Sequence, residues 1–420
     1  MRGRSGNRTS LTTRSKEKYQ DVFTTAMTSL LIVVVIFLAL MLSNKSTIGS
    51  FVGHPDHLSY VLWFALIMAV DVLKSVPYAL LRYLNKAKKF ASVKSVGISI
   101  NVALNVFFVV YYPALTGTDP DIEFVFITNL VASAVELLSV SSDIFKNLGT
   151  ASVDLWKKMF RYSWPLIILG FAGMINETFD RLALRRLLPP ETVDYEIGVY
   201  GTFYKLSMLM TIFIQAFRYA AEPLFFSQAD RSDAKSSYVQ IMNWFVFACG
   251  GIFLVTSLFK REIAELLISK PEFHNHPDAL FIVPILLMAN MLLGIFFNLS
   301  IWYKLNNKTL LGAAISLVGA VVTIALLLEY VPVYGFKAAA VTTLIAYFIM
   351  TVLSYFLGQK YYPVNYNVKV IFSLIISSVL LYVVSEYDGL VSWSAYFINT
   401  IYVVIYGLVG YRFMISTRKP

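Results

Sequence analysis

Two apolar stretches of this sequence, residues 162–187 and 197–226, carry charged and amide side chains that are able to do chemistry. Several of these groups recur at the helical spacings of three and four residues, and they are Asn176, Glu177, Asp180, Arg181, Lys205, Gln215, Arg218 and Glu222. Arginine and lysine bind phosphates, amides bind hydroxyl-rich molecules, and a buried carboxylate can take up a proton or a cation. Inside a membrane each ionisable group is costly unless it is paired or hydrated, so these groups need an explanation.

Shorter polar stripes lie in other apolar stretches and raise the same question. Their members are Asp71, Lys74, Asn101, Asn105, Asn129, Glu136, Asn290, Asn298 and Ser300. Asp71 and Lys74 are three residues apart, so they can form an ion pair on one helix face. Two interpretations are open: contacts that fix one helix against the next, or the lining of a hydrated cavity for a polar or charged cargo. We favour the cavity, because polar stripes occur on six expected helices in both halves of the chain.

The composition indicates which elements position these groups. Of 420 residues, 57% are hydrophobic and 14% are charged, whereas soluble domains average about 45–50% and about 25%. A spanning helix needs about 20 mostly apolar residues. We expect twelve spans, of which the eleventh is short, at residues 23–42, 58–81, 90–111, 122–144, 162–187, 197–226, 238–259, 280–303, 310–328, 336–357, 370–384 and 392–411. The sequence therefore predicts an all-α polytopic membrane protein.

Lysine and arginine residues between the expected spans predict its orientation. With the amino terminus in the cytoplasm, 23 of them fall on the cytoplasmic side and seven fall outside. An even number of spans then places both termini in the cytoplasm. The net charge of +10 faces anionic lipid headgroups, so we expect membrane lipids as partners and no nucleic acid.

Motifs of soluble enzymes are missing from the sequence. No glycine-rich phosphate loop follows a predicted strand, and Cys249 and the four histidines form no cluster with the spacing of metal ligands. We therefore expect no enzyme, no catalytic residue, no metal site and no cofactor. The basic start followed by an apolar run lacks a small-x-small cleavage site, so we interpret residues 23–42 as a first spanning helix.

Three strings carry a family resemblance: MFRYSWPLIILGFAGMINETFDRLAL, YGTFYKLSMLMTIFIQAFRYAAEPLFF and GIFFNLSIWYKLNNKTLLGAAISLVG. They resemble bacterial polysaccharide-biosynthesis flippases, the Wzx-type branch of the multidrug/oligosaccharidyl-lipid/polysaccharide exporter superfamily. The resemblance implies a protein of the bacterial inner membrane that moves an undecaprenyl-pyrophosphate-linked oligosaccharide to the outer leaflet. It also implies two lobes around a central cavity, alternating access, a coupling proton or sodium ion, and the polysaccharide polymerase machinery as a partner.

The resemblance suggests a domain organisation with one departure, because the family has fourteen helices and residues 16–30 resemble the approach to its third. We expect a basic cytoplasmic tail at 1–22, a shortened N-terminal lobe of four helices at 23–144 and a cytoplasmic linker at 145–161. A C-terminal lobe of six helices at 162–357 and a hairpin with a tail at 358–420 would follow. Sequence upstream of Met1 would then encode two further spans.

In such a protein the polar stripes acquire expected roles. The cavity and substrate-binding candidates are Arg218, Lys205, Arg181, Asn176, Gln215, Asn298 and Asn129. The ion-coupling candidates are Glu177, Asp180, Glu222 and Asp71. We also predict that the helices at 162–187 and 197–226 share a charge cluster in which Asp180 meets Lys205, with Glu177 and Arg181 beside them.

Two other functions remain open. A multidrug exporter of the same superfamily would have a similar outline but a more apolar, acidic pocket. A polytopic membrane glycosyltransferase, polymerase or ligase would need a large outer loop with catalytic residues. The longest expected outer loop, about residues 260–279, has no paired acidic motif of that kind.

Overall fold

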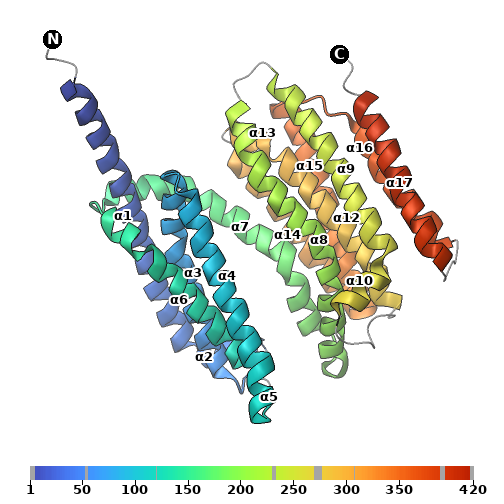
Figure 1. Cartoon of the computed structure of the whole chain (residues 1–420), viewed down its shortest axis with the longest axis horizontal. Coiled ribbons are helices and arrows are strands. Elements are labelled where there is room, and N and C mark those ends of the chain that lie inside the picture. The colour runs from blue at the N-terminus through green and yellow to red at the C-terminus, as the bar shows by residue number, and fades with distance from the viewer. Residues whose placement is uncertain are drawn as a thin grey trace. The chain divides into compact units, whose positions relative to one another are not determined.

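The computed structural model describes residues 5–52, 55–119, 121–228, 233–268, 277–306, 308–387 and 393–416. Within these ranges the chain forms helices joined by short connections, and it forms no strand (Figure 1). The chain divides into two compact units, Met1–Tyr162 and Ser163–Pro420. The lobes, linker and hairpin expected from the sequence stay predictions.

The first unit is built from four long helices, which are α1 (Ser5–Ser43), α3 (Leu58–Tyr83), α4 (Ala87–Val106) and α6 (Glu123–Lys146). Helix α3 packs against α1 and α6, and α4 packs against α6. Three short elements complete this unit, namely α2 (Lys45–Val52), the π-helical turn η1 (Phe107–Tyr111) and α5 (Tyr112–Thr116). Helix α6 is therefore the element to which both α3 and α4 present their side chains.

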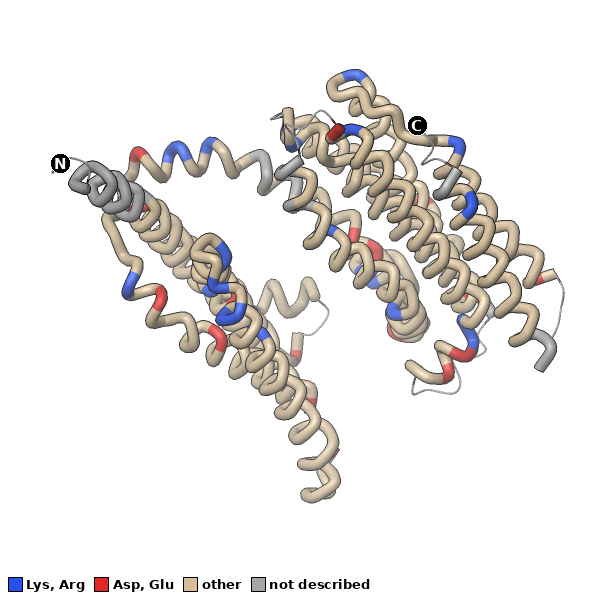
Figure 2. Tube along the Cα trace, turned by 45° about the horizontal axis from the view of Figure 1, so that its top comes forward, with Lys and Arg blue, Asp and Glu red and all other residues tan. Residues whose placement is uncertain are grey.

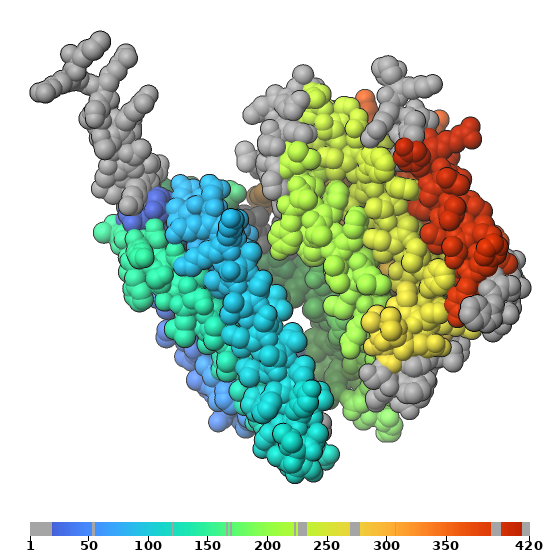
Figure 3. All heavy atoms as spheres, viewed as in Figure 1, coloured from blue at the N-terminus to red at the C-terminus, as the bar shows by residue number. Residues whose placement is uncertain are grey.

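Helix α7 (Val153–Leu187) begins in the first unit and ends in the second. The second unit continues with α8 (Pro190–Gln228), α9 (Ala234–Leu258), α10 (Lys260–Leu267), α12 (Pro277–Leu299), α13 (Ile301–Leu305), α14 (Thr309–Tyr334), α15 (Phe336–Tyr361), α16 (Val368–Tyr387) and α17 (Trp393–Ser416). Helix α12 is its centre, since it packs against α8, α9 and α15. Helices α16 and α17 both contact α9, and the red α17 lies beside it in Figure 3.

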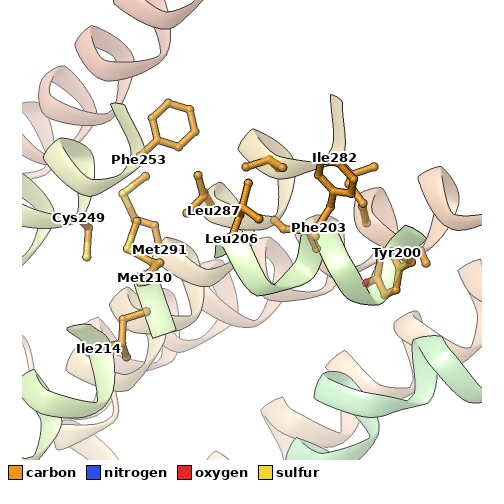
Figure 4. Close-up of a cluster of buried hydrophobic side chains, with 14 of the residues drawn as sticks. Tyr200, Phe203, Leu206, Met210, Ile214, Cys249, Phe253, Ile282, Leu287 and Met291 are labelled. Atoms are coloured by element: carbon orange, nitrogen blue, oxygen red, sulfur yellow. The ribbon is translucent and has the colours of Figure 1, made fainter. Parts of the chain in front are cut away.

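The core of the second unit follows from the apolar spacing of α8. Phe203, Leu206, Met210 and Ile214 recur every three or four residues and are almost fully buried. They contact apolar side chains of α9 and α12 (Figure 4). Cys249 is buried in the same core. This core fixes α8, and with it the polar residues that α8 carries on its other faces.

Surface composition supports a membrane environment. On α1, Ile32, Val33, Val35 and Ile36 are each more than half exposed, which is typical of a helix that faces lipid. In the described part of the chain, ten helical segments are long and apolar enough to cross a membrane. They correspond to ten of the twelve expected spans, and the other two correspond to helices α7 and α17. The chain is an all-α polytopic membrane protein, as predicted.

Candidate functional site

Asn176 on α7 joins three helices of the second unit. Its side chain is 4% exposed. Its amide nitrogen donates to the Ser316 carbonyl oxygen of α14 at 3.3 Å, and its amide oxygen accepts from the Thr323 hydroxyl at 3.0 Å. The Tyr347 hydroxyl of α15 donates to its backbone carbonyl oxygen at 3.3 Å. The structure thus places this predicted cavity residue in a buried contact of α7 with α14 and α15.

Asp180 lies one turn after Asn176 and faces α8. Its carboxylate accepts a hydrogen bond from the Tyr200 hydroxyl at 2.6 Å and another from the Arg181 backbone N–H at 2.7 Å. The Arg181 guanidinium lies 3.8 Å from the same carboxylate. The guanidinium carbon also lies 4.5 Å from the centre of the Tyr204 ring, a cation–π contact. Two tyrosines of α8, Tyr200 and Tyr204, therefore contact the Asp180–Arg181 pair of α7.

The expected contact between Asp180 and Lys205 is not formed among the described residues. Tyr200 donates to the Asp180 carboxylate, whereas Lys205 is exposed. The reason is the rotation of α8 about its axis. At about 100° per residue, Lys205 projects roughly 140° away from Tyr200, while Tyr204 projects only about 40° away. The face of α8 that meets α7 therefore carries tyrosines, and the predicted cluster of four charges shrinks to Asp180 and Arg181.

A small cavity lies beside Arg218, where α8 meets α12 and α13. Its walls are formed by Phe217, Arg218, Ala221, Phe225, Phe297, Asn298, Ser300, Ile301 and Lys304. Its volume is about 20 Å³, roughly enough for one water molecule. The Arg218 guanidinium carbon lies 4.0 Å from the centre of the Phe297 ring, so an aromatic face holds the cation at the cavity wall.

Asn298 places at this cavity an amide oxygen that accepts no hydrogen bond from the described residues. The residue is 6% exposed, and its amide nitrogen donates to the Gly294 carbonyl oxygen of its own helix at 3.1 Å. Its amide oxygen has no hydrogen-bond partner in the described part of the chain. A buried acceptor without a donor costs about 1–3 kcal/mol. The cavity is thus lined by two basic residues, Arg218 and Lys304, and by one acceptor that can bind a hydroxyl group.

Three other residues predicted from the sequence, Glu177, Gln215 and Glu222, lie on helices α7 and α8. Glu177 of α7 is exposed, and its charge interacts with that of Arg218. Gln215 is exposed one turn before Arg218 on α8. The side chain of Glu222 lies outside the described residues. The structure therefore brings Arg218 and Asn298 together at the cavity, and Glu177 acts on Arg218 through its charge.

The first unit holds a separate charged cluster between α3, α4 and α6. Lys74 is 7% exposed, and its ammonium group lies 2.8 Å from the Asp71 carboxylate and 2.5 Å from the Glu136 carboxylate. It also donates to the Ser133 hydroxyl at 3.0 Å, and that hydroxyl donates to Asp71 at 2.7 Å. The expected pairing of Asp71 with Lys74 is confirmed, and Glu136 adds a second carboxylate.

Glu136 is held by two further groups. The Tyr78 hydroxyl donates to its carboxylate at 2.9 Å, and the Lys94 ammonium group lies 3.2 Å from the same oxygen. Lys94 also lies 4.9 Å from the centre of the Tyr78 ring. Gly97 permits this arrangement, because a side chain at that position would collide with Glu136. Every charged group of this cluster therefore has a partner.

Asn129 belongs to a chain of amides that joins α6 to α4. Its side-chain oxygen accepts from the Asn101 amide at 2.7 Å, and Asn105 donates to the Asn101 side-chain oxygen at 2.9 Å. Asn101 and Asn105 form the polar stripe expected from their spacing, and the contact with Asn129 on the next helix adds to it. They lie in the first unit, so the structure describes them apart from the cavity beside Arg218.

Lys304 and Lys94 belong to the cavity and to the charged cluster, and both are missing from the candidates chosen by sequence. Lys304 lines the cavity, although it falls one residue beyond the expected span 280–303. A signal was present, because Lys304 lies four residues after Ser300, so both project from one side of a helix. Lys94 lies inside the expected span 90–111, and its partner Glu136 is 42 residues away, a separation that helical spacing cannot detect.

Solved structures with a similar fold are membrane transporters. The "Lipid II flippase MurJ, inward closed conformation" matches with a TM-score of 0.65 and 15% identity, over 95% of this chain and 85% of that chain. An inward-facing multidrug resistance MATE family transporter of the MOP superfamily matches with a TM-score of 0.65 and 13% identity, over 83% of this chain and 82% of that chain. At such identities the similarity establishes the fold alone.

A third similar structure is a MOP superfamily transporter from Pyrococcus furiosus, described as having a binding pocket of reverse polarity that suggests a different function. It matches with a TM-score of 0.65 and 14% identity, over 83% of this chain and 79% of that chain. Among curated proteins the comparison finds no match. A family model described as polysaccharide biosynthesis protein matches residues 7–229, which is more than half of the chain. The chain therefore belongs to the polysaccharide biosynthesis protein family, as its sequence predicted.

Proposed function

We propose that this protein moves an undecaprenyl-pyrophosphate-linked oligosaccharide across the bacterial inner membrane by alternating access. The observation that carries the proposal is the cavity beside Arg218, where a membrane helix presents a cation on an aromatic face next to an unsatisfied amide oxygen. A pyrophosphate with a sugar chain carries anionic oxygens and many hydroxyl groups. Both would lose their hydrogen bonds in hydrocarbon, so an unaided crossing is very slow.

The cavity residues suit the two polar parts of this cargo. Arg218 and Lys304 would bind the pyrophosphate oxygens, because charge-assisted hydrogen bonds are the strong ones. The Asn298 amide oxygen would accept a hydrogen bond from a sugar hydroxyl, and Phe297 would pack against a sugar ring. The prenyl chain stays in lipid throughout. The cavity is small, about 20 Å³, so binding requires the helices around it to separate.

Glu177 is the best placed of the ion-coupling candidates. Its charge interacts with that of Arg218, so the carboxylate and a pyrophosphate compete for the same cation. A proton or sodium ion on Glu177 would free Arg218 for cargo, and loss of that ion would favour release. Asp180, Asp71 and Glu222 remain candidates of the same kind, although Tyr200 and Lys74 already hold the first two.

We further propose that both termini lie in the cytoplasm, as the distribution of lysine and arginine indicates. Helix α8 then ends at the cytoplasmic face, and Arg218 lies ten residues before its end at Gln228. The cavity would receive cargo made in the cytoplasm. Membrane lipids and the polysaccharide polymerase machinery are the partners that this function implies.

The test follows a fluorescent lipid-linked oligosaccharide in vesicles that contain the purified protein. Its arrival in the opposite leaflet is measured with a quencher that does not cross the membrane. We expect Arg218→Ala to slow flipping about tenfold or more, because a hydrogen bond to a charged group contributes about 1.5–3 kcal/mol. Arg218→Lys should retain part of the rate, since the charge remains.

Lys235→Ala provides the matched control. Lys235 also rests on an aromatic ring, 4.9 Å from the centre of Tyr362, but it does not line the cavity. Equal rates for Arg218→Ala and Lys235→Ala would contradict the proposal. Export of a cationic drug without any flipping of the oligosaccharide would instead favour the multidrug exporter, although two cations in the cavity disfavour such a substrate.

A further inference from the structure

Helix α7 is longer than a membrane requires. Its 35 residues extend about 50 Å at 1.5 Å per residue, whereas the hydrocarbon core of a bilayer is about 30 Å thick. More than ten residues must therefore lie outside the core. The first ten, Val153–Tyr162, belong to the first unit, so they can be described together with α1 and α6.

These ten residues form an amphipathic segment. Three exposed cations, Lys157, Lys158 and Arg161, share one side of the helix with Asp154, within an arc of about 100°. A run of basic residues at the start of α7 is visible in Figure 2. The three cations form no ion pair with the described residues. The segment thus carries an excess of two positive charges that form no ion pair within the described part of the chain.

An exposed apolar stripe runs beside the basic side. Val153, Trp156 and Phe160 are 69%, 41% and 50% exposed, and they lie at spacings of three and four. The rings of Trp156 and Phe160 are stacked with their centres 5.2 Å apart. Water would be a poor solvent for this stripe, so the exposure indicates an apolar or interfacial environment.

Hydrogen bonds join the residues just before this segment, 149–152, to the middle of α1. The Asp21 carboxylate accepts from the backbone N–H and the hydroxyl of Thr150, at 2.7 and 2.8 Å. The Thr24 hydroxyl accepts from the Gly149 N–H at 2.7 Å, and the Thr25 hydroxyl accepts from the Ser152 N–H at 3.1 Å. Asp21, Thr24 and Thr25 lie in the first turns of the spanning segment Tyr19–Ser43. The segment therefore begins at the boundary of the membrane and not out in solvent.

We propose that Val153–Tyr162 lies on the membrane surface and binds the headgroups of anionic phospholipids. Trp156 and Phe160 enter the interface, where amphipathic aromatic and apolar side chains are favoured. Lys157, Lys158 and Arg161 contact the lipid phosphates, and each cation adds to the attraction of an anionic surface. The segment thereby anchors the connection that leads into the second unit. The occupant is lipid because the same helix continues into the bilayer and its charge complements that of the headgroups.

The test uses the full-length protein in vesicles of phosphatidylcholine and phosphatidylglycerol, with bromine on the acyl chains of one lipid or the other. Bromine quenches nearby tryptophans. The chain has six tryptophans, so the signal of Trp156 is obtained as the difference between the unmodified protein and Trp156→Leu. We expect brominated phosphatidylglycerol to quench Trp156 about two- to fivefold more than brominated phosphatidylcholine does.

The triple variant Lys157→Gln/Lys158→Gln/Arg161→Gln should lose this preference while Trp156 stays quenched. The conservative variant Lys157→Arg/Lys158→Arg/Arg161→Lys should retain the preference, which separates loss of charge from loss of folding. Removal of three cations elsewhere, in Lys235→Gln/Lys360→Gln/Lys369→Gln, should leave it unchanged. Absence of quenching by either lipid, equal quenching by both, or a preference that survives in the glutamine variant would overturn the proposal. None of these measurements involves cargo, so they stand apart from the test of flipping.

Discussion

The charged cluster of the first unit and the cavity of the second unit place cations inside membrane helices in two different ways. In the first unit, Lys74 and Glu136 are paired with each other and with neighbours on three helices. In the second unit, Arg218 rests on the Phe297 ring and the Asn298 amide oxygen has no partner in the described part of the chain. The first arrangement satisfies its own members, while the second leaves polar capacity for a ligand.

This difference favours helix packing for the cluster of the first unit and the proposed binding site for the cavity beside Arg218. Closed pairing is what helix packing in a membrane requires, because an unpaired charge is expensive there. Unused polar capacity is what a binding site requires, because its partners arrive with the cargo. The number of polar stripes in the sequence favours a cavity for all of them. Their contacts in the structure differ, because some stripes are fully paired and others keep an unpaired acceptor among the described residues. Variants of the two regions should therefore differ in whether they reduce stability or transport.

The largest expected effect is that of Lys74→Met in the first unit. It leaves the buried Glu136 carboxylate with Lys94 and Tyr78 only, and breaking a buried pair costs about 3–5 kcal/mol. We expect the free energy of unfolding in mixed micelles, measured by titration with a denaturing detergent, to fall by that order. The double variant Lys74→Met/Glu136→Met should recover part of the loss, because it removes the uncompensated charge. Equal or larger loss in the double variant would show that packing, and not pairing, makes this cluster important.

A smaller effect on the free energy of unfolding distinguishes Tyr200, the observed partner of Asp180, from Lys205, the partner expected from the sequence. Tyr200→Phe removes the hydroxyl that donates to the carboxylate at 2.6 Å, which should lower the free energy of unfolding by about 1.5–3 kcal/mol. Lys205→Gln should change it by less than about 0.5 kcal/mol, since Lys205 is exposed. The same detergent titration measures both. A larger loss for Lys205→Gln than for Tyr200→Phe would restore the ion pair that the sequence predicted.

Local spacing explains what could be predicted from the sequence. The apolar stretches gave the spanning helices, because the length of a spanning helix is set by the membrane. The separation of three residues between Asp71 and Lys74 predicted their ion pair, because both residues lie on one helix. The stripe of Asn101 and Asn105 was predicted for the same reason.

Contacts between different helices could not be predicted from the spacing of residues along the sequence. The pairing of Lys74 with Glu136 joins residues 62 positions apart, and it depends on which faces of α3 and α6 meet. The error at Lys205 has the same origin, since the depth of a residue in the membrane says nothing about the rotation of its helix. The core residues of α8, from Phe203 to Ile214, decide that rotation. Their apolar spacing was a signal from which the face toward α7 could have been worked out.

A small expected change in stability, and the sharpest contrast between the two regions, comes from Asn298→Leu. Leucine has a similar volume, and it removes an acceptor that has no donor along with one hydrogen bond to Gly294. The gain and the loss nearly cancel, so the free energy of unfolding should change by less than about 1 kcal/mol. Flipping of the lipid-linked oligosaccharide should nevertheless slow severalfold, because the cavity loses its acceptor for a hydroxyl group.

Ser133→Ala in the first unit is the matched comparison, since Ser133 accepts from Lys74 and donates to Asp71. It should lower stability by about 1–2 kcal/mol and leave the flipping rate per folded molecule unchanged. A stable Ser133→Ala protein that flips slowly, beside an unstable Asn298→Leu protein that flips normally, would reverse the roles of the two regions.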